Sequence, residues 1–274
     1  MDLVLKIEIG LLPLLYFLVA VTYGWLFFTD REDVRRIATP LFRLTLALHL
    51  LFLILLAIRW RQFPAATVSQ ALSATAFAVA AVYAFVEWHG KVPSTGFWTL
   101  SLACLFEVLA FLLRTPQPPY KEIFHSPLFS THAAFGLLGY AAFAIAAGYG
   151  FLFLRLYREI KRRRFSLFFG KLPPLEVLER MMSGALVAGF VALTGAVVSG
   201  GVWARQVFDE GWHHDPKILF TAATWGFYGL ALFLRRLHRW HGRQTAVASL
   251  AGFAAVLFSL LAVNLYFSDV HGFL

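Results

Sequence analysis

The chain has 274 residues, of which 59% are hydrophobic and only 14% are charged, and its mean hydropathy is +0.70. Soluble domains carry about 25% charged residues, so this composition excludes a soluble globular protein. The apolar residues form continuous runs and do not alternate with polar ones, which excludes a β-barrel and predicts an all-α, polytopic membrane protein. The net charge of +9 then belongs to the loops and is not a signal for nucleic acid.

A transmembrane helix needs about 20 apolar residues. The sequence predicts eight spans in a single transmembrane domain, residues 1–274, without a soluble module longer than a loop. The first span lacks a basic leader and a small-residue cleavage site, so we interpret it as a helix and not as a signal peptide. In chain order the spans are Ile9–Phe28, Pro40–Ile58, Ala71–Trp88, Phe97–Leu113, Leu128–Leu154, Met182–Trp203, Ile218–Leu234 and Ala246–Phe267.

Lysine and arginine predict the orientation of these spans, because cytoplasmic loops carry an excess of both. The first, fifth and seventh loops are strongly basic, whereas the second, fourth and sixth hold two basic residues each and the third holds only Lys91. We therefore expect odd loops in the cytoplasm and both termini outside, in the cytoplasmic membrane of a prokaryote. The basic clusters are Arg31, Arg35 and Arg36; Arg155, Arg158, Lys161, Arg162, Arg163, Arg164, Lys171 and Arg180; and Arg235, Arg236, Arg239 and Arg243.

One polar stretch, Gly200–Lys217, lies between two apolar runs on the sixth loop, which we expect to be outside. Flat aromatic side chains at a membrane surface can hold a flat ligand, although an interfacial aromatic belt would have the same composition. Asp followed by Pro is typical of a helix start, and a helix N-terminus attracts anionic groups. The stretch contains Trp203, Trp212, His213, His214, Asp215 and Pro216.

Histidines gather on the same predicted side. His132 lies near the outer start of the fifth span, and His271 follows the outer end of the eighth. His125, His213 and His214 are also on outer loops. Neutral imidazole is a common ligand of haem iron, whereas an isolated histidine at a helix end is usually an ordinary interfacial residue. The single cysteine, Cys104, excludes an internal disulfide, a CxxC pair and a CxxCH haem-attachment site.

Five features occur in a fixed order from about Ser130 onward and resemble the WWD-type haem-handling proteins of cytochrome c assembly. The branch they resemble most is the system II, CcsA/HemX-like one. In the first half only the His in span two and the RW…FP pattern of Arg59–Pro64 are similar. The five features are THAAFGLLGYAAF (Thr131–Phe143), the Pro-Leu-Glu loop and helix (Leu172–Ala204), GWHHDPK (Gly211–Lys217), the stretch Arg239–Leu265 and DVHGF (Asp269–Phe273).

The resemblance implies that the protein binds haem b at its outer face and presents it to apocytochrome c. It implies axial iron ligation by His132 and His271. It also implies a partner, a second membrane protein with a large outer domain, with which the chain would form a cytochrome c synthase. The remaining cofactor-binding residues that it implies, on and beside the outer loop 204–217, are Trp203, Trp212, His214, Asp215, Lys217 and Arg205.

The chain departs from the family pattern at four positions: His214 replaces the second motif Trp, Ile218 an acidic residue, Gln70 an acid at the head of span three, and Phe233 a span-seven His. Phe cannot ligate iron, so we predict no haem held between His49 and a span-seven ligand.

Two ionisable residues lie inside predicted spans, where such residues are costly and have a functional role by default. His49 is a candidate intramembrane ligand, and a hydrogen bond between helices is the equal alternative for it. Glu107 is expected to bond a neighbouring Ser or Trp, without an assigned role.

Two other functions use the same residue pattern. The chain could be an electron-transfer subunit that keeps its haem b, in which case haem stays bound at all times. It could also be a haem-free scaffold or regulator, as the HemX-like branch allows, and the purified protein would then be colourless. The absorption spectrum of the purified protein distinguishes the three.

The loop charges make a prediction about topology. A reporter fused at Glu210 should give the signal of the outer compartment, and one fused at Arg163 that of the cytoplasm, because the basic loops stay inside. Paired alkaline phosphatase and fluorescent-protein fusions measure this. The reverse pattern would contradict haem handling at an outer face.

Overall fold

The computed structural model describes residues 2–90, 95–114, 125–163, 166–207, 214–237 and 240–260. In this part of the chain the regular structure is helical throughout, which confirms the predicted all-α class. The helices are α1 (Asp2–Thr29), α2 (Glu32–Trp60), α3 (Val68–Gly90), α4 (Gly96–Leu112), α5 (Pro127–Arg162), α6 (Leu167–Lys171), α7 (Leu175–Val207), α8 (Pro216–Arg236) and α9 (Gly242–Phe258).

The protein is a polytopic membrane protein. Six of the described helices, α1, α2, α3, α5, α7 and α8, are long and apolar enough to cross a bilayer. The fourth predicted span corresponds to α4 and the described start of the eighth to α9, and each of these two helices has 17 residues. α5, with 36 residues, continues well beyond its predicted apolar span. At 1.5 Å per residue it is about 54 Å long, so it extends past the roughly 30 Å of hydrocarbon.

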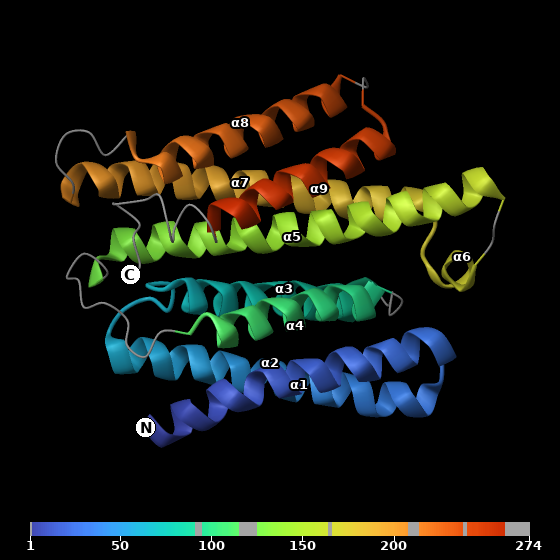
Figure 1. The fold of residues 1–274 in the computed structure, drawn as a ribbon, viewed down its shortest axis with the longest axis horizontal. Helices are drawn as coiled ribbons and strands as arrows, with labels where there is room; N and C mark the ends of the chain where they lie inside the picture. The colour runs from blue at the N-terminus through green and yellow to red at the C-terminus, as the bar shows by residue number, and fades with distance from the viewer. Residues whose placement is uncertain are drawn as a thin grey trace.

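The helices lie nearly side by side in two groups (Figure 1). α1 to α4 form the first group, in which α1 contacts α2 and α4, and α3 packs on α4. α5, α7, α8 and α9 form the second. α5 joins the two groups because it contacts α3 on one side and α7 and α9 on the other.

The loops separate into two sets at opposite ends of the bundle, as the sequence predicted (Figure 1). The α1–α2 turn, the α5–α7 connection with α6 and the end of α8 lie together at what we call the basic end. The α2–α3 connection, the start of α5, the end of α7 and the start of α8 lie at the other, which we call the site end. Which end faces the cytoplasm stays a prediction.

α5 and α7 pack antiparallel, with glycines of one helix against side chains of the other. Gly189 faces the Phe143 ring, which itself stacks on Tyr228 with ring centroids 3.8 Å apart. Farther toward the site end, Gly139 lies against the backbone of Leu193. Gly195 then accepts the ring of Phe135. These contacts let the two helices approach closely, which is how membrane helices gain packing energy.

Gly189 therefore leads to a stability prediction. A Cβ at this position would lie 2.7 Å from the Phe143 ring, which Tyr228 prevents from moving. We expect Gly189→Ala to destabilise the protein by about 1–3 kcal/mol through overpacking. The matched control is Gly184→Ala on the same helix, where nothing lies within 4 Å. Thermal unfolding in detergent measures both, and equal midpoints for the two variants would refute the overpacking account.

Candidate functional site

His132 lies on the second turn of α5, at the site end. The local sequence explains why a helix begins here. Ser126 is the N-cap, and its side chain accepts a hydrogen bond from the backbone N–H of Phe129 at 3.0 Å. Pro127 occupies the first helical position, where its lack of an N–H has no cost. This start aims the first turns of α5 along the end of α7.

Two residues of α7, Ala196 and Trp203, contact the His132 ring. Its Nδ1 lies 2.9 Å from the carbonyl oxygen of Ala196. A carbonyl can only accept, so Nδ1 carries the proton and donates it. The Trp203 ring lies nearly parallel to the imidazole, with centroids 6.1 Å apart and an interplanar angle of 16°. With Nδ1 engaged in this way, Nε2 is the nitrogen through which His132 would bind a metal.

Trp203 is buried, with 4% of its side chain exposed. Its ring packs against Phe129 of α5, with centroids 5.4 Å apart, and against Ala66. Ala66 belongs to the α2–α3 connection, so the first helix group contributes to the site. In the structure the Trp203 ring stacks on His132, and a contact of Trp203 with a porphyrin stays a prediction.

The connection 61–67 is held in place at both of its ends. His125, just before α5, donates from Nδ1 to the carbonyl oxygen of Arg61 at 2.7 Å. At the other end, the side chain of Gln70 accepts from the backbone N–H of Ala66 at 3.0 Å, and the Gln70 N–H donates to Thr67 Oγ1 at 3.1 Å. Gln70 therefore closes the turn that carries Ala66.

An open, mostly apolar groove of about 420 Å³ lies between Phe63 of the connection 61–67 and the first three turns of α5, and His132 is not among its lining residues. Sequence reasoning missed this contribution of the first half, although the Arg59–Pro64 pattern was a signal of it. The lining residues of the groove are Phe63, Ser130, Thr131, Ala134, Phe135 and Leu138.

The predicted Asp-Pro helix start is also present at the site end. α8 begins at Pro216, and the Asp215 side chain accepts from the Lys217 backbone N–H at 2.8 Å. Lys217 is buried at 8% exposure, whereas Arg205 on the last turn of α7 and His214 are exposed. Arg205 is therefore the more accessible of the two predicted cations. Trp212 and His271 lie outside the described residues.

The chain is similar to known proteins over nearly its full length. The family model described as "Cytochrome C assembly protein" matches residues 10–271. The chain belongs to this family. The cytochrome c biogenesis protein CcsA of Mesostigma viride is 25% identical over 252 residues, which cover 82% of this chain and 83% of that protein. CcsA of Prochlorococcus marinus strain MIT 9312 is 34% identical over 98 residues, 36% of this chain and 32% of that protein. The resemblance found from the sequence is thereby confirmed.

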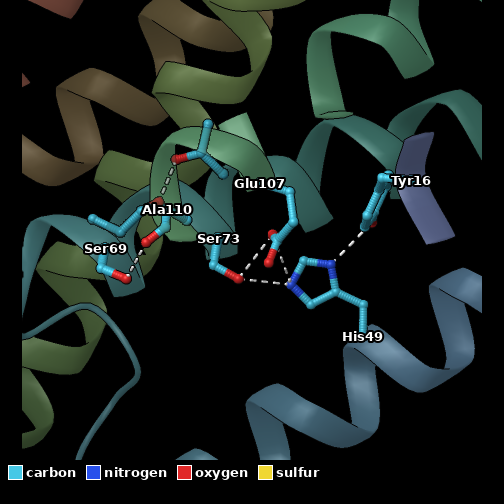
Figure 2. A network of polar contacts seen from close by, with 8 residues as sticks. Tyr16, His49, Ser69, Ser73, Glu107 and Ala110 are labelled. Carbon is cyan, nitrogen blue, oxygen red and sulfur yellow. Dashed lines mark hydrogen bonds and ion pairs between the residues drawn. The ribbon is translucent and has the colours of Figure 1, made fainter. Parts of the chain in front are cut away.

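Inside the first helix group, His49 belongs to a hydrogen-bonded network that joins four helices (Figure 2). Tyr16 Oη of α1 lies 2.9 Å from His49 Nδ1 of α2, and His49 Nε2 lies 3.0 Å from Ser73 Oγ of α3. Ser73 donates to Glu107 Oε2 of α4 at 3.0 Å. Because the Ser73 proton goes to Glu107, His49 donates from Nε2, and Tyr16 donates to Nδ1. The chain of donors runs one way, from Tyr16 to Glu107.

This network corresponds to one of the two roles considered for His49, the hydrogen bond between helices. Both ring nitrogens are engaged, and the side chain is fully buried. Iron ligation by His49 would require one of these bonds to break. Glu107, which is 4% exposed, bonds a serine as expected. The sequence could not identify Tyr16 and Ser73 as the partners, because hydroxyl groups are common in spans.

Phe233, which occupies the place of a possible span-seven ligand, lies on an exposed face of α8. Phe233 is 59% exposed, so its side chain points away from the helix bundle. α8 and α2 lie on opposite sides of the bundle, with α5 between them (Figure 1). In the described part of α8, position 233 therefore does not face His49. The prediction about this haem remains to be tested by haem stoichiometry.

The network predicts an order of stabilities. Ser73→Ala removes two buried hydrogen bonds and Tyr16→Phe removes one, so Ser73→Ala should cost more. We expect about 1 kcal/mol per bond, as for other polar contacts between membrane helices. Ser183→Ala is the control, because that hydroxyl bonds the Glu179 carbonyl of its own helix. Unfolding in mixed detergent measures all three, and a cost for Ser73→Ala no larger than that for Ser183→Ala would contradict the network's role.

Proposed function

We propose that this protein holds haem at its site end and presents it to apocytochrome c during cytochrome c biogenesis. The observation that carries the proposal is the geometry of His132. A metal-ligating histidine commonly donates its second ring N–H to a carbonyl or carboxylate, which fixes the tautomer and orients the ring. The Nδ1 bond of His132 to Ala196 and the parallel Trp203 ring fit a haem ligand in this way.

The second axial ligand in this proposal is His271, which follows from the resemblance. Haem iron takes one imidazole on each face, and two separate chain segments supply opposite faces more easily than one helix does. His132 comes from α5, and His271 lies beyond α9. Bound in this way, haem would be low-spin and of the b type.

The surroundings of His132 are suited to the rest of the haem molecule. The groove between Phe63 and α5 offers an apolar edge, and Arg205 offers an exposed cation for a propionate. The N-terminus of α8, with Pro216 at its first position, supports anion binding through its N–H groups. The remaining haem contacts that the resemblance implies are Trp212, His214, Lys217 and Asp215.

The acceptor would supply the thiols. Cys104 is the only cysteine of the chain and lies buried in α4, so both sulfurs and the replacing histidine would come from the CxxCH of apocytochrome c. This chain would keep haem oriented while one axial ligand is exchanged. Together with a second membrane protein that has a large outer domain, it would form a cytochrome c synthase in the cytoplasmic membrane of a prokaryote, with the site end outside.

Ligand replacement tests the axial pair. His132→Gly or His271→Gly should lower the bound haem or make it high-spin, because one axial position is emptied. Added imidazole should restore the low-spin spectrum by refilling that position. Absorption spectra of the purified protein, with and without imidazole, measure this. The control is His89→Gly on the last turn of α3, at the basic end.

Full low-spin haem in the double variant without imidazole would refute the axial pair. A colourless wild-type protein that does not take up haemin would favour the haem-free scaffold. Haem that remains with the chain while a cytochrome c matures beside it would favour the electron-transfer subunit.

A further inference from the structure

The row of glycine contacts between α5 and α7 ends at His132. Gly200 is the α7 residue that faces the imidazole. A Cβ at position 200 would lie 2.5 Å from Nδ1 and 2.7 Å from Cε1 of His132. Real Cβ atoms do not approach other atoms this closely, so any other residue at position 200 would displace the ring. Gly200 therefore makes room for the His132 ring in the same way as Gly189 makes room for the Phe143 ring.

The atom that this Cβ would meet first is also the atom that carries the hydrogen bond. Nδ1 donates to Ala196, one turn before Gly200 on the same helix. Trp203, which follows Gly200 on α7 by three residues, stacks on the imidazole ring. The backbone of α7 thus receives the imidazole between Ala196 and Trp203, and this space exists because residue 200 has no side chain. A methyl group there would break the Nδ1 bond and turn the ring away from Trp203.

We propose that Gly200 is a positioning residue, which allows α7 to hold His132 in the Nδ1–H tautomer so that the ring binds haem iron through Nε2. This inference rests on the proposed haem-holding function. It extends that function by naming the backbone groups of α7, the Ala196 carbonyl and Gly200, that orient the His132 ring. Orientation of this kind matters because replacing the partners that orient a ligating histidine typically costs about 10- to 100-fold in metal affinity.

The chain contains its own control. Gly201 follows Gly200 on α7, and nothing lies within 4 Å of a Cβ built at that position. Alanine is a better helix former than glycine at both positions, so any loss in Gly200→Ala comes from the contact with His132. The same substitution at two adjacent residues therefore separates an effect on His132 from a general effect on α7.

The first experiment measures haem binding by the full chain in detergent, titrated with haemin. Gly201→Ala should match the wild type in affinity and low-spin spectrum. Gly200→Ala should bind at least about tenfold more weakly or show high-spin haem. Imidazole should restore the low-spin spectrum of Gly200→Ala, because the fold persists and only the ligand has moved. A chain that had merely unfolded would not recover in this way.

The second experiment needs no haem. In the apoprotein labelled with ¹⁵N-histidine, solid-state NMR distinguishes an Nδ1–H from an Nε2–H imidazole, and His132→Gly assigns the signal. The wild type and Gly201→Ala should show the Nδ1–H form at His132, and Gly200→Ala should lose it. An Nε2–H form in the wild type would overturn the proposal whatever the variants do.

The outcomes separate the two levels of the proposal. A wild-type chain that takes up no haemin contradicts the proposed function itself. A wild type that binds haem, while Gly200→Ala keeps the same affinity, spectrum and tautomer, overturns only the role of Gly200. Loss of low-spin haem in Gly201→Ala to the same extent as in Gly200→Ala would also overturn it, because the effect would then belong to the helix and not to His132.

Discussion

The antiparallel contact between α5 and α7 holds the second helix group together and positions His132. In a bilayer the hydrophobic effect does not drive helices together, so close packing supplies much of the attraction. Here that packing is achieved by glycines that accept large rings, such as Gly189 under Phe143 and Gly195 under Phe135. The same register brings His132 to Ala196 and Gly200 at the site end. A shift of one helix along the other would separate the imidazole from the carbonyl that orients it.

The first helix group takes part in the site through its connection at the site end. Ala66 covers Trp203, and Phe63 forms one wall of the groove. The connection is continuous with α3, whose first turns are tied to α4 by the bond of Ser69 to the Ala110 carbonyl at 2.7 Å and by that of Ser73 to Glu107 (Figure 2). The buried polar network thus stabilises the helices that hold the wall of the site.

His49 and His132 show how environment separates two histidines of one chain. His49 is fully buried, and each ring nitrogen has a hydroxyl partner. In hydrocarbon an unsatisfied polar atom is costly, so this arrangement stabilises a neutral imidazole and the helices around it. His132 is only partly buried, and its Nδ1 is bonded to a backbone carbonyl of the neighbouring helix. That hydrogen bond orients the ring in the way expected of a metal ligand. His132 itself lies at the end of the bundle.

The all-α class, the approximate positions of the long apolar helices and the separation of the loops could be predicted from the sequence, because apolar length and loop charge are local properties of the chain. The sequence also located the start of α8, since the Asp215–Pro216 cap acts within one turn. The stacking of Trp203 on His132, the contact of Ala66 with Trp203 and the bonds of Tyr16 and Ser73 to His49 became visible only in the folded structure. Those contacts join segments far apart in the chain, and they depend on helix register. Register is set by the fit of glycines to rings across an interface, which no local pattern of residues specifies.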